Sequence, residues 1–179
     1  ERLLCATGPH EGEILRPSDQ KEPETVAFVQ CAGSRDENHL PYCSAVCCMA
    51  SMKQARYVRE NNENAKATIF YIDLRTIGRE EDFYYDLLKD ENVSFVKGKV
   101  AKIEEDAATK NLLLDVEDTL STENLHGNFD LVVLATGVVP NAADTKIPFE
   151  LNYDAYGFVD GSTDVDGVYA AGCAHRPCD

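Results

Sequence analysis

The sequence has no long apolar run, no signal-peptide pattern and few basic residues. No window approaches the roughly 18 consecutive apolar residues of a membrane-spanning helix. The first twenty residues lack the basic, apolar and small-residue order of a secretory signal. With 32 acidic against 17 basic residues, the net charge of −15 repels nucleic-acid phosphates and anionic lipid surfaces. We therefore expect neither insertion into a membrane nor binding to nucleic acid.

The glycine-rich fingerprint G-x-G-x-x-G, which cradles the pyrophosphate of a dinucleotide, is also absent. It normally follows the first strand of a βαβ unit, and an acid that ends the second strand binds the ribose. Here Asp73 ends the second apolar run, but the first run leads into Cys31, Ala32 and Gly33. We therefore expect this unit not to bind a nicotinamide nucleotide, and Asp73 alone is typical of an acid at a strand end.

The sequence does contain alternating strand-like and helical segments. Its 179 residues are 44% hydrophobic and 27% charged, which suffices for a buried core and a globular protein. Short apolar runs at residues 25–31 and 67–73 are typical of buried parallel strands, and helical patterns cover residues 41–61 and 80–90. This order predicts an α/β fold with a Rossmann-like parallel sheet.

After residue 90 the pattern changes to antiparallel strands. Residues 93–96, 99–105 and 112–118 are strand-like, and the polar turn at 106–111 predicts a β-hairpin layer. A polar link at 121–128 precedes a buried strand at 129–137, and a last strand is expected at 167–174. We divide the chain into a connecting segment 1–24, a Rossmann-like inserted domain 25–120 with the cysteine cluster, and a return segment 121–179.

Four of the seven cysteines crowd into eighteen residues, at Cys31, Cys43, Cys47 and Cys48. An odd, clustered set favours a reducing cytosol and a metal site over secreted disulfides. On a helix from Pro41, Cys43 and Cys47 would share one face, and Cys31 would approach the helix N-terminus, which favours thiolates. Four thiolates suit a [4Fe–4S] cluster or tetrahedral zinc, although adjacent cysteines depart from the usual zinc ribbon and ferredoxin patterns. Redox-active or simply buried cysteines are the third interpretation.

Two short glycine motifs lie near the end of the sequence. LATG at residues 134–137 contains Thr136 and Gly137, and GVYAAG at residues 167–172 leads into Cys173 and Ala174. In this order they are typical of flavoproteins with two dinucleotide-binding domains. There the first motif marks the strand that returns from the inserted domain, and the second passes under the flavin. The pair predicts a partial flavoprotein of this kind.

Several segments together resemble the A subunits of heterodisulfide reductases. The resemblance is carried by VAFVQCAGSRD (26–36), YCSAVCCM (42–49) with KQA (53–55), and AAGCA (170–174), and it extends from Gly12 onward. IFYID (69–73) and AHRPC (174–178) are most similar to the branch found in the quinone-interacting membrane-bound oxidoreductase complex of sulfate reducers.

The resemblance implies a thioredoxin-reductase-like flavoprotein that carries FAD and a [4Fe–4S] cluster. The cluster ligands that it implies are Cys31, Cys43, Cys47 and Cys48. The FAD-binding residues that it implies are Thr136, Gly137, Gly172, Cys173 and Ala174. Cys173 replaces the aspartate of related reductases, so the contact it makes is open, and His175 and Cys178 are interpreted as ordinary loop residues.

The implied function is that of an oxidoreductase component that relays electrons between FAD and the cluster, with no general acid or base. The implied partners are other subunits of a redox complex. In the quinone-linked branch these are membrane-associated quinone-reactive subunits and adenylylsulfate reductase, which would place a cytoplasmic protein at the inner membrane.

Two alternatives belong to other classes: a non-catalytic interaction domain stabilised by zinc, and an NAD(P)H-dependent flavin reductase with Asp73 as ribose acceptor. The missing fingerprint and the missing ferredoxin-type cysteine runs predict a piece of a longer protein. We expect such a piece to retain FAD poorly and to be inactive by itself.

Overall fold

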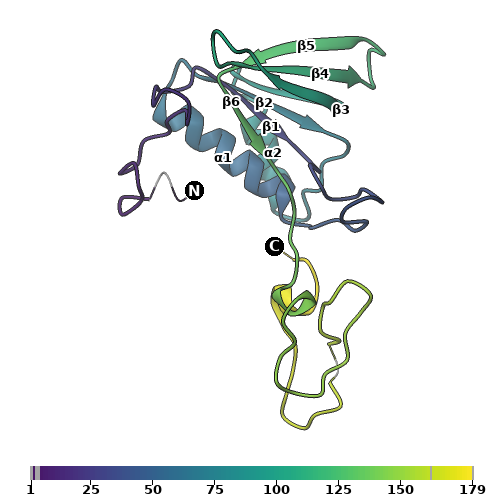
Figure 1. Cartoon of the computed structure of the whole chain (residues 1–179). Coiled ribbons are helices and arrows are strands. Elements are labelled where there is room, and N and C mark those ends of the chain that lie inside the picture. The colour runs from purple at the N-terminus through teal and green to yellow at the C-terminus, as the bar shows by residue number, and fades with distance from the viewer. Residues whose placement is uncertain (1, 3–4, 162, 179) are drawn as a thin grey trace. The chain divides into compact units, whose positions relative to one another are not determined.

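The computed structural model describes residues 2, 5–161 and 163–178. Along the chain its elements are β1 Thr25–Val29, α1 Cys47–Asn61, β2 Lys66–Tyr71, α2 Glu80–Leu87, β3 Val93–Glu105, β4 Leu112–Asp118, β5 Asn124–Phe129, β6 Leu131–Leu134, and the short 3₁₀ helices η1 Asn141–Ala143 and η2 Gly172–Ala174 (Figure 1). No helix in the described part is long and apolar enough to cross a membrane.

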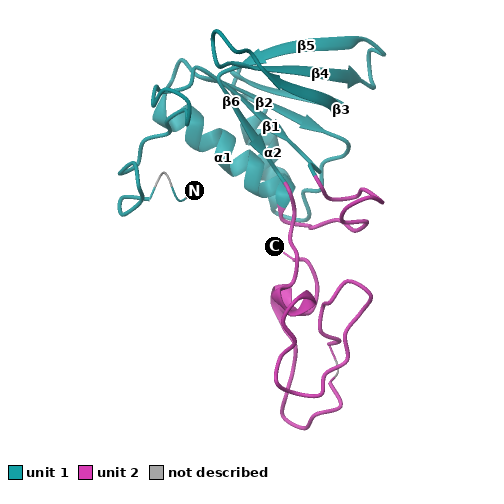
Figure 2. Cartoon of the chain, in the orientation of Figure 1, with its two compact units in different colours: residues 1–32, 47–135 teal, residues 33–46, 136–179 magenta. Residues whose placement is uncertain are grey.

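The chain divides into two compact units (Figure 2). Unit 1 comprises Glu1–Ala32 and Cys47–Ala135, and unit 2 comprises Gly33–Val46 and Thr136–Asp179. The predicted domain boundaries at residues 24 and 120 stay a prediction. The predicted segments 1–24 and 121–179 include residues 1, 3, 4, 162 and 179, which lie outside the described residues.

Unit 1 is built on a six-stranded sheet with the order β5-β4-β3-β2-β1-β6. Strands β6, β1, β2 and β3 pair in parallel, whereas β3, β4 and β5 pair antiparallel. The parallel part, the connecting helices and the β3–β4 hairpin at residues 106–111 confirm the predicted α/β fold with a hairpin layer.

Strand β3 is one continuous strand, although the sequence indicated two. It pairs with β2 in parallel from Val93 to Lys97, and with β4 antiparallel from Gly98 onward. At this change of partner the strands approach closely, since a Cβ added to Gly98 would lie 2.2 Å from the carbonyl oxygen of Glu117. A glycine is therefore required where one ladder gives way to the other.

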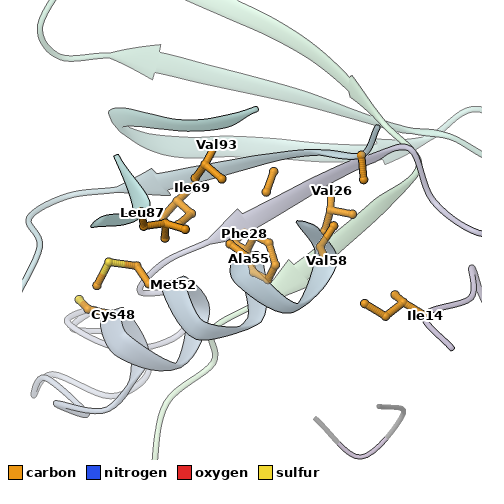
Figure 3. Packing of buried hydrophobic residues seen from close by; sticks show 12 residues of the cluster. Ile14, Val26, Phe28, Cys48, Met52, Ala55, Val58, Ile69, Leu87 and Val93 are labelled. Atoms are coloured by element: carbon orange, nitrogen blue, oxygen red, sulfur yellow. The ribbon is translucent and has the colours of Figure 1, made fainter. Parts of the chain in front are cut away.

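The core on one face of the sheet lies between β1, β2 and the two helices. Side chains of α1 recur at helical spacing toward this face, and Phe28, 1% exposed, lies among them (Figure 3). The buried cluster consists of Ile14, Val26, Phe28, Cys48, Met52, Ala55, Val58, Ala65, Ala67, Ile69, Leu87 and Val93.

The opposite face of the same strands is buried as well. Ala27 and Val29 of β1 pack with Phe70 of β2 and with Leu114 and Val116 of β4. Successive strand residues point to opposite faces, so a strand that is covered on both sides must be apolar throughout. This is why β1 has a continuous apolar sequence.

Asp130 holds the start of β6 against the start of β1. Its Oδ2 accepts hydrogen bonds from the backbone N–H of Glu24 at 3.0 Å and from the N–H and Oγ1 of Thr25, each at 2.9 Å. Its Oδ1 lies 3.4 Å from Nη1 of the buried Arg16. A residue of the predicted connecting segment is thereby fixed to the sheet.

Two predicted elements of unit 1 are wrong in their bounds. The polar link at 121–128 is mostly strand β5, whose inward and outward residues alternate and which pairs with β4. The helix expected from Pro41 begins at Cys47, because Ala45 has φ = 62°, outside the right-handed helical region. Cys43 therefore lies outside α1, and the prediction that Cys43 and Cys47 share one helical face is wrong.

Unit 2 contains little regular structure in its described residues. Isolated bridges such as Ser34↔Leu40 and Tyr153↔Val159 take the place of a sheet among these residues. The strand expected at 167–174 does not form; its end is η2, where Gly172 has φ = 57° and begins a tight turn. Glycine adopts this conformation without a Cβ clash, so the turn displaces the strand.

Tyr42 is the centre of a small aromatic cluster in unit 2. Its ring lies 4.8 Å from that of Tyr156 and 5.5 Å from that of Phe158, between ring centroids. Burial, with smaller effects of Asp154 and Tyr156, raises the pKa of Tyr42. The protonated phenol donates to the carbonyl oxygen of Val138 at 3.0 Å.

Candidate functional site

Cys31 follows β1 in a left-handed conformation, with φ = 54°. This conformation costs a residue with a Cβ about 1–2 kcal/mol, and such strain gathers at functional sites. The next residue is fixed, since the N–H of Ala32 donates to the carbonyl oxygen of Ala135 at 3.1 Å. The backbone at this cysteine is thus held in place at a cost in conformational energy.

Gln30 links the end of β1 to the first residue of α1. Its Nε2 donates to the carbonyl oxygen of Cys47 at 3.3 Å, and its side chain is buried. Its Oε1 is buried with no hydrogen-bond partner among the described residues. A buried acceptor without a donor is costly, and a bound ion or water is one way in which proteins satisfy such a group.

Cys47 and Cys48 open α1. The first turn contains no acidic residue, so nothing there neutralises the partial positive charge at the N-terminus of the helix. This field favours thiolates and anionic ligands. Cys48 is 8% exposed and packs near Met52, and its Sγ lies 3.9 Å from the carbonyl oxygen of Asp73 (Figure 3).

Cys43 belongs to unit 2, whereas Cys31, Cys47 and Cys48 belong to unit 1. Its Sγ accepts the N–H of Ala45 at 3.4 Å. Within the described ranges, no three His, Cys, Asp or Glu side chains are grouped so as to hold a metal ion. The four-cysteine ligand set stays a prediction.

The first glycine motif is locked by two serines of unit 2. The hydroxyl groups of Ser34 and Ser44 lie 2.8 Å apart, and Ser44 Oγ accepts the N–H of Val138 at 2.9 Å. Ser34 Oγ donates to the carbonyl oxygen of Thr136 at 3.4 Å. Gly137 has φ = 105°, and a Cβ there would lie 2.1 Å from Ser34 Oγ and 2.5 Å from Ser44 Oγ.

A pocket of about 320 Å³ in unit 2 lies beside the segments that follow the two glycine motifs. One wall directly follows Thr136 and Gly137, and another contains Cys173 and Ala174 of the second motif. Its volume is at the small end of ligand sites. The lining residues are Val138, Val139, Pro140, Asn141, Ala142, Thr145, Ile147, Val159, Cys173 and Ala174. Of the predicted cofactor residues, Cys173 and Ala174 line this pocket, and Thr136, Gly137 and Gly172 do not; the set stays a prediction.

Asp73 follows β2 and is half-exposed. Its carboxylate lies 4.0 Å from Nε of Arg75, which is an ion pair at the limit of contact on the surface. Such exposed pairs contribute little to stability. This arrangement is that of an ordinary acid at a strand end, as its position in the sequence indicated.

Sequence reasoning missed Gln30, Ser44 and Tyr42 as parts of these sites. Ser44 and Tyr42 flank Cys43, and no sequence pattern indicates a role for either. Gln30 resembles an ordinary polar residue at the end of a strand. The available signal was a buried-strand pattern ending in an amide, because a polar residue there needs a partner. The partner itself, the Cys47 carbonyl, could not be found by spacing.

No family model matches the chain. The chain is similar to the A subunits of heterodisulfide reductases. One from Methanopyrus kandleri, named an iron-sulfur subunit, is 39% identical in a match that covers all of this chain and 29% of the relative's own length. The counterpart from Methanocaldococcus jannaschii is 37% identical over the same shares, and that of Methanosarcina acetivorans is 37% identical over 99% of this chain and 24% of its own length.

Solved structures support the fold. The thioredoxin reductase of T. acidophilum matches 86% of this chain and 45% of its own, with a TM-score of 0.59 and 19% identity. That of Lactococcus lactis matches the same shares with a TM-score of 0.56 and 17% identity. Over its whole length the chain is therefore a homologue of the heterodisulfide reductase A subunits, and it spans about 29% of the length of the first of these relatives.

Proposed function

We propose that this chain is the part of a heterodisulfide-reductase-A-type flavoprotein that relays electrons between FAD and a [4Fe–4S] cluster held by Cys31, Cys43, Cys47 and Cys48. The observation that carries the proposal is the pair Cys47-Cys48 at an N-terminus of α1 that has no acid in its first turn. Relatives 37–39% identical over the whole chain are named iron-sulfur subunits of reductases, which supports it.

The residue types at these four positions suit a cluster of this kind. Thiolates are the ligands that iron–sulfur clusters take, and a bound cluster supplies one-electron transfer. The N-terminus of α1 would stabilise the negative charge of four thiolates. Cys48 lies in the apolar core, which keeps water from one side of the site. Gln30 fixes the end of β1 to the first residue of α1, so the backbones at Cys31 and Cys47 keep their spacing.

The proposed FAD-binding residues are Thr136, Gly137, Gly172, Cys173 and Ala174. Gly137 permits a backbone conformation in which the serine hydroxyls lie where a side chain would be. The pocket beside it is lined mainly by aliphatic side chains, which suits a flat, largely apolar ring. The chain lacks the G-x-G-x-x-G fingerprint for the FAD pyrophosphate, so we propose these residues as a partial site.

The proposed partners are other subunits of a redox complex. The relatives are named as A subunits, which supports an assembly. At a finer level we propose membrane-associated quinone-reactive subunits and adenylylsulfate reductase as partners, with the protein in the cytoplasm beside the inner membrane. Electrons would then pass between a membrane quinol and adenylylsulfate reductase through this chain and the subunits on either side of it.

The decisive experiment measures iron and acid-labile sulfide per chain after reconstitution without oxygen, with visible spectra before and after dithionite. We expect about four irons and four sulfides per chain, with a brown colour that reductant bleaches. Cys47→Ser should lose most of the iron. Cys5→Ser is the matched control, because Cys5 is exposed and lies outside the cluster motif, and it should retain the full content.

Other outcomes would contradict the proposal. About one zinc per chain without iron would favour the zinc-stabilised interaction domain. Equal iron in both variants would show that Cys47 is no ligand. FAD binding is measured separately by flavin fluorescence quenching with wild type and Gly137→Ala. Equal quenching by both would remove the proposed flavin role of Gly137 without touching the cluster.

A further inference from the structure

Cys173 and Cys178, two cysteines outside the cluster motif, lie together in unit 2. Their Sγ atoms are 3.9 Å apart, and Cys173 Sγ is 3.5 Å from the carbonyl oxygen of Cys178. A disulfide has an S–S length of about 2.0 Å, so the sulfurs must approach by about 2 Å to bond. Side-chain rotation over a short loop achieves a movement of this size.

The loop between the two cysteines is shaped by its backbone. Gly172 begins η2 with φ = 57°, and its carbonyl oxygen accepts the N–H of His175 at 3.0 Å and of Arg176 at 3.1 Å. Pro177 then restricts the backbone just before Cys178. The resulting turn returns Cys178 to Cys173, so their proximity follows from the fold of the turn.

The turn is also anchored to the rest of unit 2. The N–H of Val159 donates to the carbonyl oxygen of Ala174 at 2.8 Å, and Nδ1 of His175 lies 3.0 Å from the carbonyl oxygen of Val159. Gly161 lies against the ring of His175, since a Cβ there would be 2.8 Å from Cε1. Three contacts therefore hold the loop that carries the two thiols.

The two cysteines differ in access. Cys173 is exposed and lines the unit 2 pocket, whereas Cys178 is half-buried. A small reagent therefore reaches Cys173 more readily, and the Cys178 thiol is near enough to attack an adduct formed there. This is the arrangement of an attacking thiol with a resolving thiol.

We propose that Cys173 and Cys178 form a redox-active dithiol that exchanges with low-molecular-weight disulfides. The Cys173 thiolate attacks the disulfide R–S–S–R, forms a mixed disulfide and releases one R–S⁻. The Cys178 thiolate then attacks Sγ of Cys173 and releases the second R–S⁻. The two cysteines lose two electrons and two protons in total. These reduce R–S–S–R to two R–SH, while the protein gains one disulfide.

This dithiol shares Cys173 with the proposed FAD site, but it shares no residue with the proposed cluster. The exchange needs neither the cluster nor FAD, and none of the four cluster cysteines takes part. Oxidation would alter one wall of the pocket, because Cys173 lines it. The shape of that pocket would then depend on the ratio of thiols to disulfides around the protein.

The test equilibrates the full chain with mixtures of reduced and oxidised glutathione without oxygen, followed by acid quenching, alkylation and peptide mass spectrometry. In wild type we expect an intrachain disulfide between Cys173 and Cys178. In Cys178→Ser we expect a glutathione adduct on Cys173 that is not resolved. Cys5 is the internal control: exposed and outside the pair, it should form mixed disulfides only.

A comparison with the unfolded chain shows whether the fold creates the pair. The equilibrium constant for closing the disulfide should be about tenfold or more larger in the native protein than in concentrated urea, because the turn raises the effective concentration of the second thiol. An equal or smaller constant in the native protein would overturn the proposal. So would preferential pairing of Cys173 with a cysteine other than Cys178.

Discussion

Each of the two units of this chain is stabilised internally by a different kind of contact. Unit 1 has a six-stranded sheet with a buried apolar cluster on each face. Unit 2 has isolated bridges, two 3₁₀ helices, a serine pair around a glycine and a small group of aromatic rings. Unit 1 depends on the summed burial of many side chains, whereas unit 2 depends on a few specific contacts.

The difference explains where the candidate sites lie. A sheet packed on both faces leaves little freedom for its strands, so the strand end at Cys31 and the helix start at Cys47 are well fixed. Loops held by single hydrogen bonds allow the glycine conformations and the pocket that unit 2 contains.

The largest effect should come from a matched pair of buried phenylalanines. Phe28→Ala removes a ring from the centre of unit 1, where it is 1% exposed, and should lower the free energy of unfolding by about 3–5 kcal/mol. Phe158→Ala removes an equally buried ring from unit 2. It should instead expose unit 2 to protease while the urea transition of the sheet, followed by circular dichroism, moves little. A large shift of that transition in Phe158→Ala would contradict the contrast.

The next effect concerns two glycines of unit 2 with left-handed backbones. Gly137→Ala places a Cβ against two serine hydroxyls, and overpacking of this kind costs about 1–3 kcal/mol beyond the backbone strain. Gly167→Ala has φ = 80° but nothing within 4 Å, so it should cost only about 1–2 kcal/mol of strain. Proteolysis rates of unit 2 measure the difference. Equal rates would show that the two serine side chains move away from the added Cβ without a measurable cost in stability.

A smaller effect is expected from Ser44→Ala. This change leaves the N–H of Val138 without its acceptor and should cost about 1–2 kcal/mol. Ser121→Ala is the control, because its hydroxyl bonds Asp118 at the exposed surface. Hydrogen exchange of the Val138 amide should accelerate in Ser44→Ala and stay unchanged in the control. An unchanged rate in both variants would argue against this serine lock.

The smallest effect is electrostatic and lies in unit 1. Burial opposes ionisation of Asp90, but hydrogen bonds from Arg59 and from the N–H of Asn92 outweigh it and lower its pKa. A pKa lowered by folding stabilises the protein above the unfolded value of about 3.9, and this stabilisation is lost as the pH falls through the folded value.

Asp90→Asn should therefore destabilise the protein by about 0.5–1 kcal/mol at pH 7, and by progressively less toward pH 3. Urea midpoints across this range measure the change. Glu91→Gln is the neighbouring control at an exposed position and should show no such trend. A difference that is constant with pH would mean that the charge of Asp90 does not contribute.

The sequence predicted the elements that are defined by apolar runs. Strands β1 and β2 follow from short apolar runs, β4 from a strand-like segment, and the hairpin from its turn residues. Strand β5 was not predicted because only Leu125 and Phe129 in it are large and apolar. Its strand conformation depends on hydrogen bonding to β4, which the sequence pattern does not show. The start of α1 was missed because no sequence pattern indicates the left-handed conformation of Ala45, which residues other than glycine rarely adopt.

The candidate sites were predictable only in part. The glycine motifs pointed to Cys173 and Ala174, and the structure places both in a pocket with the segment after Gly137. The cysteine spacing identified four thiols, but not how Gln30 ties β1 to α1. Contacts between segments that are far apart in sequence have no local signal, whereas burial and turns do.

The clasp between Asp130 and Thr25 also bears on the order of folding. The two residues are 105 positions apart, so during synthesis β1 cannot pair with β6 until β6 has left the ribosome. The β3–β4–β5 ribbon, made of near neighbours, can form earlier. Until β6 arrives, one edge of β1 is open to strands of other chains. Closing the clasp is thus the step that ends the exposure of the β1 edge to misassembly.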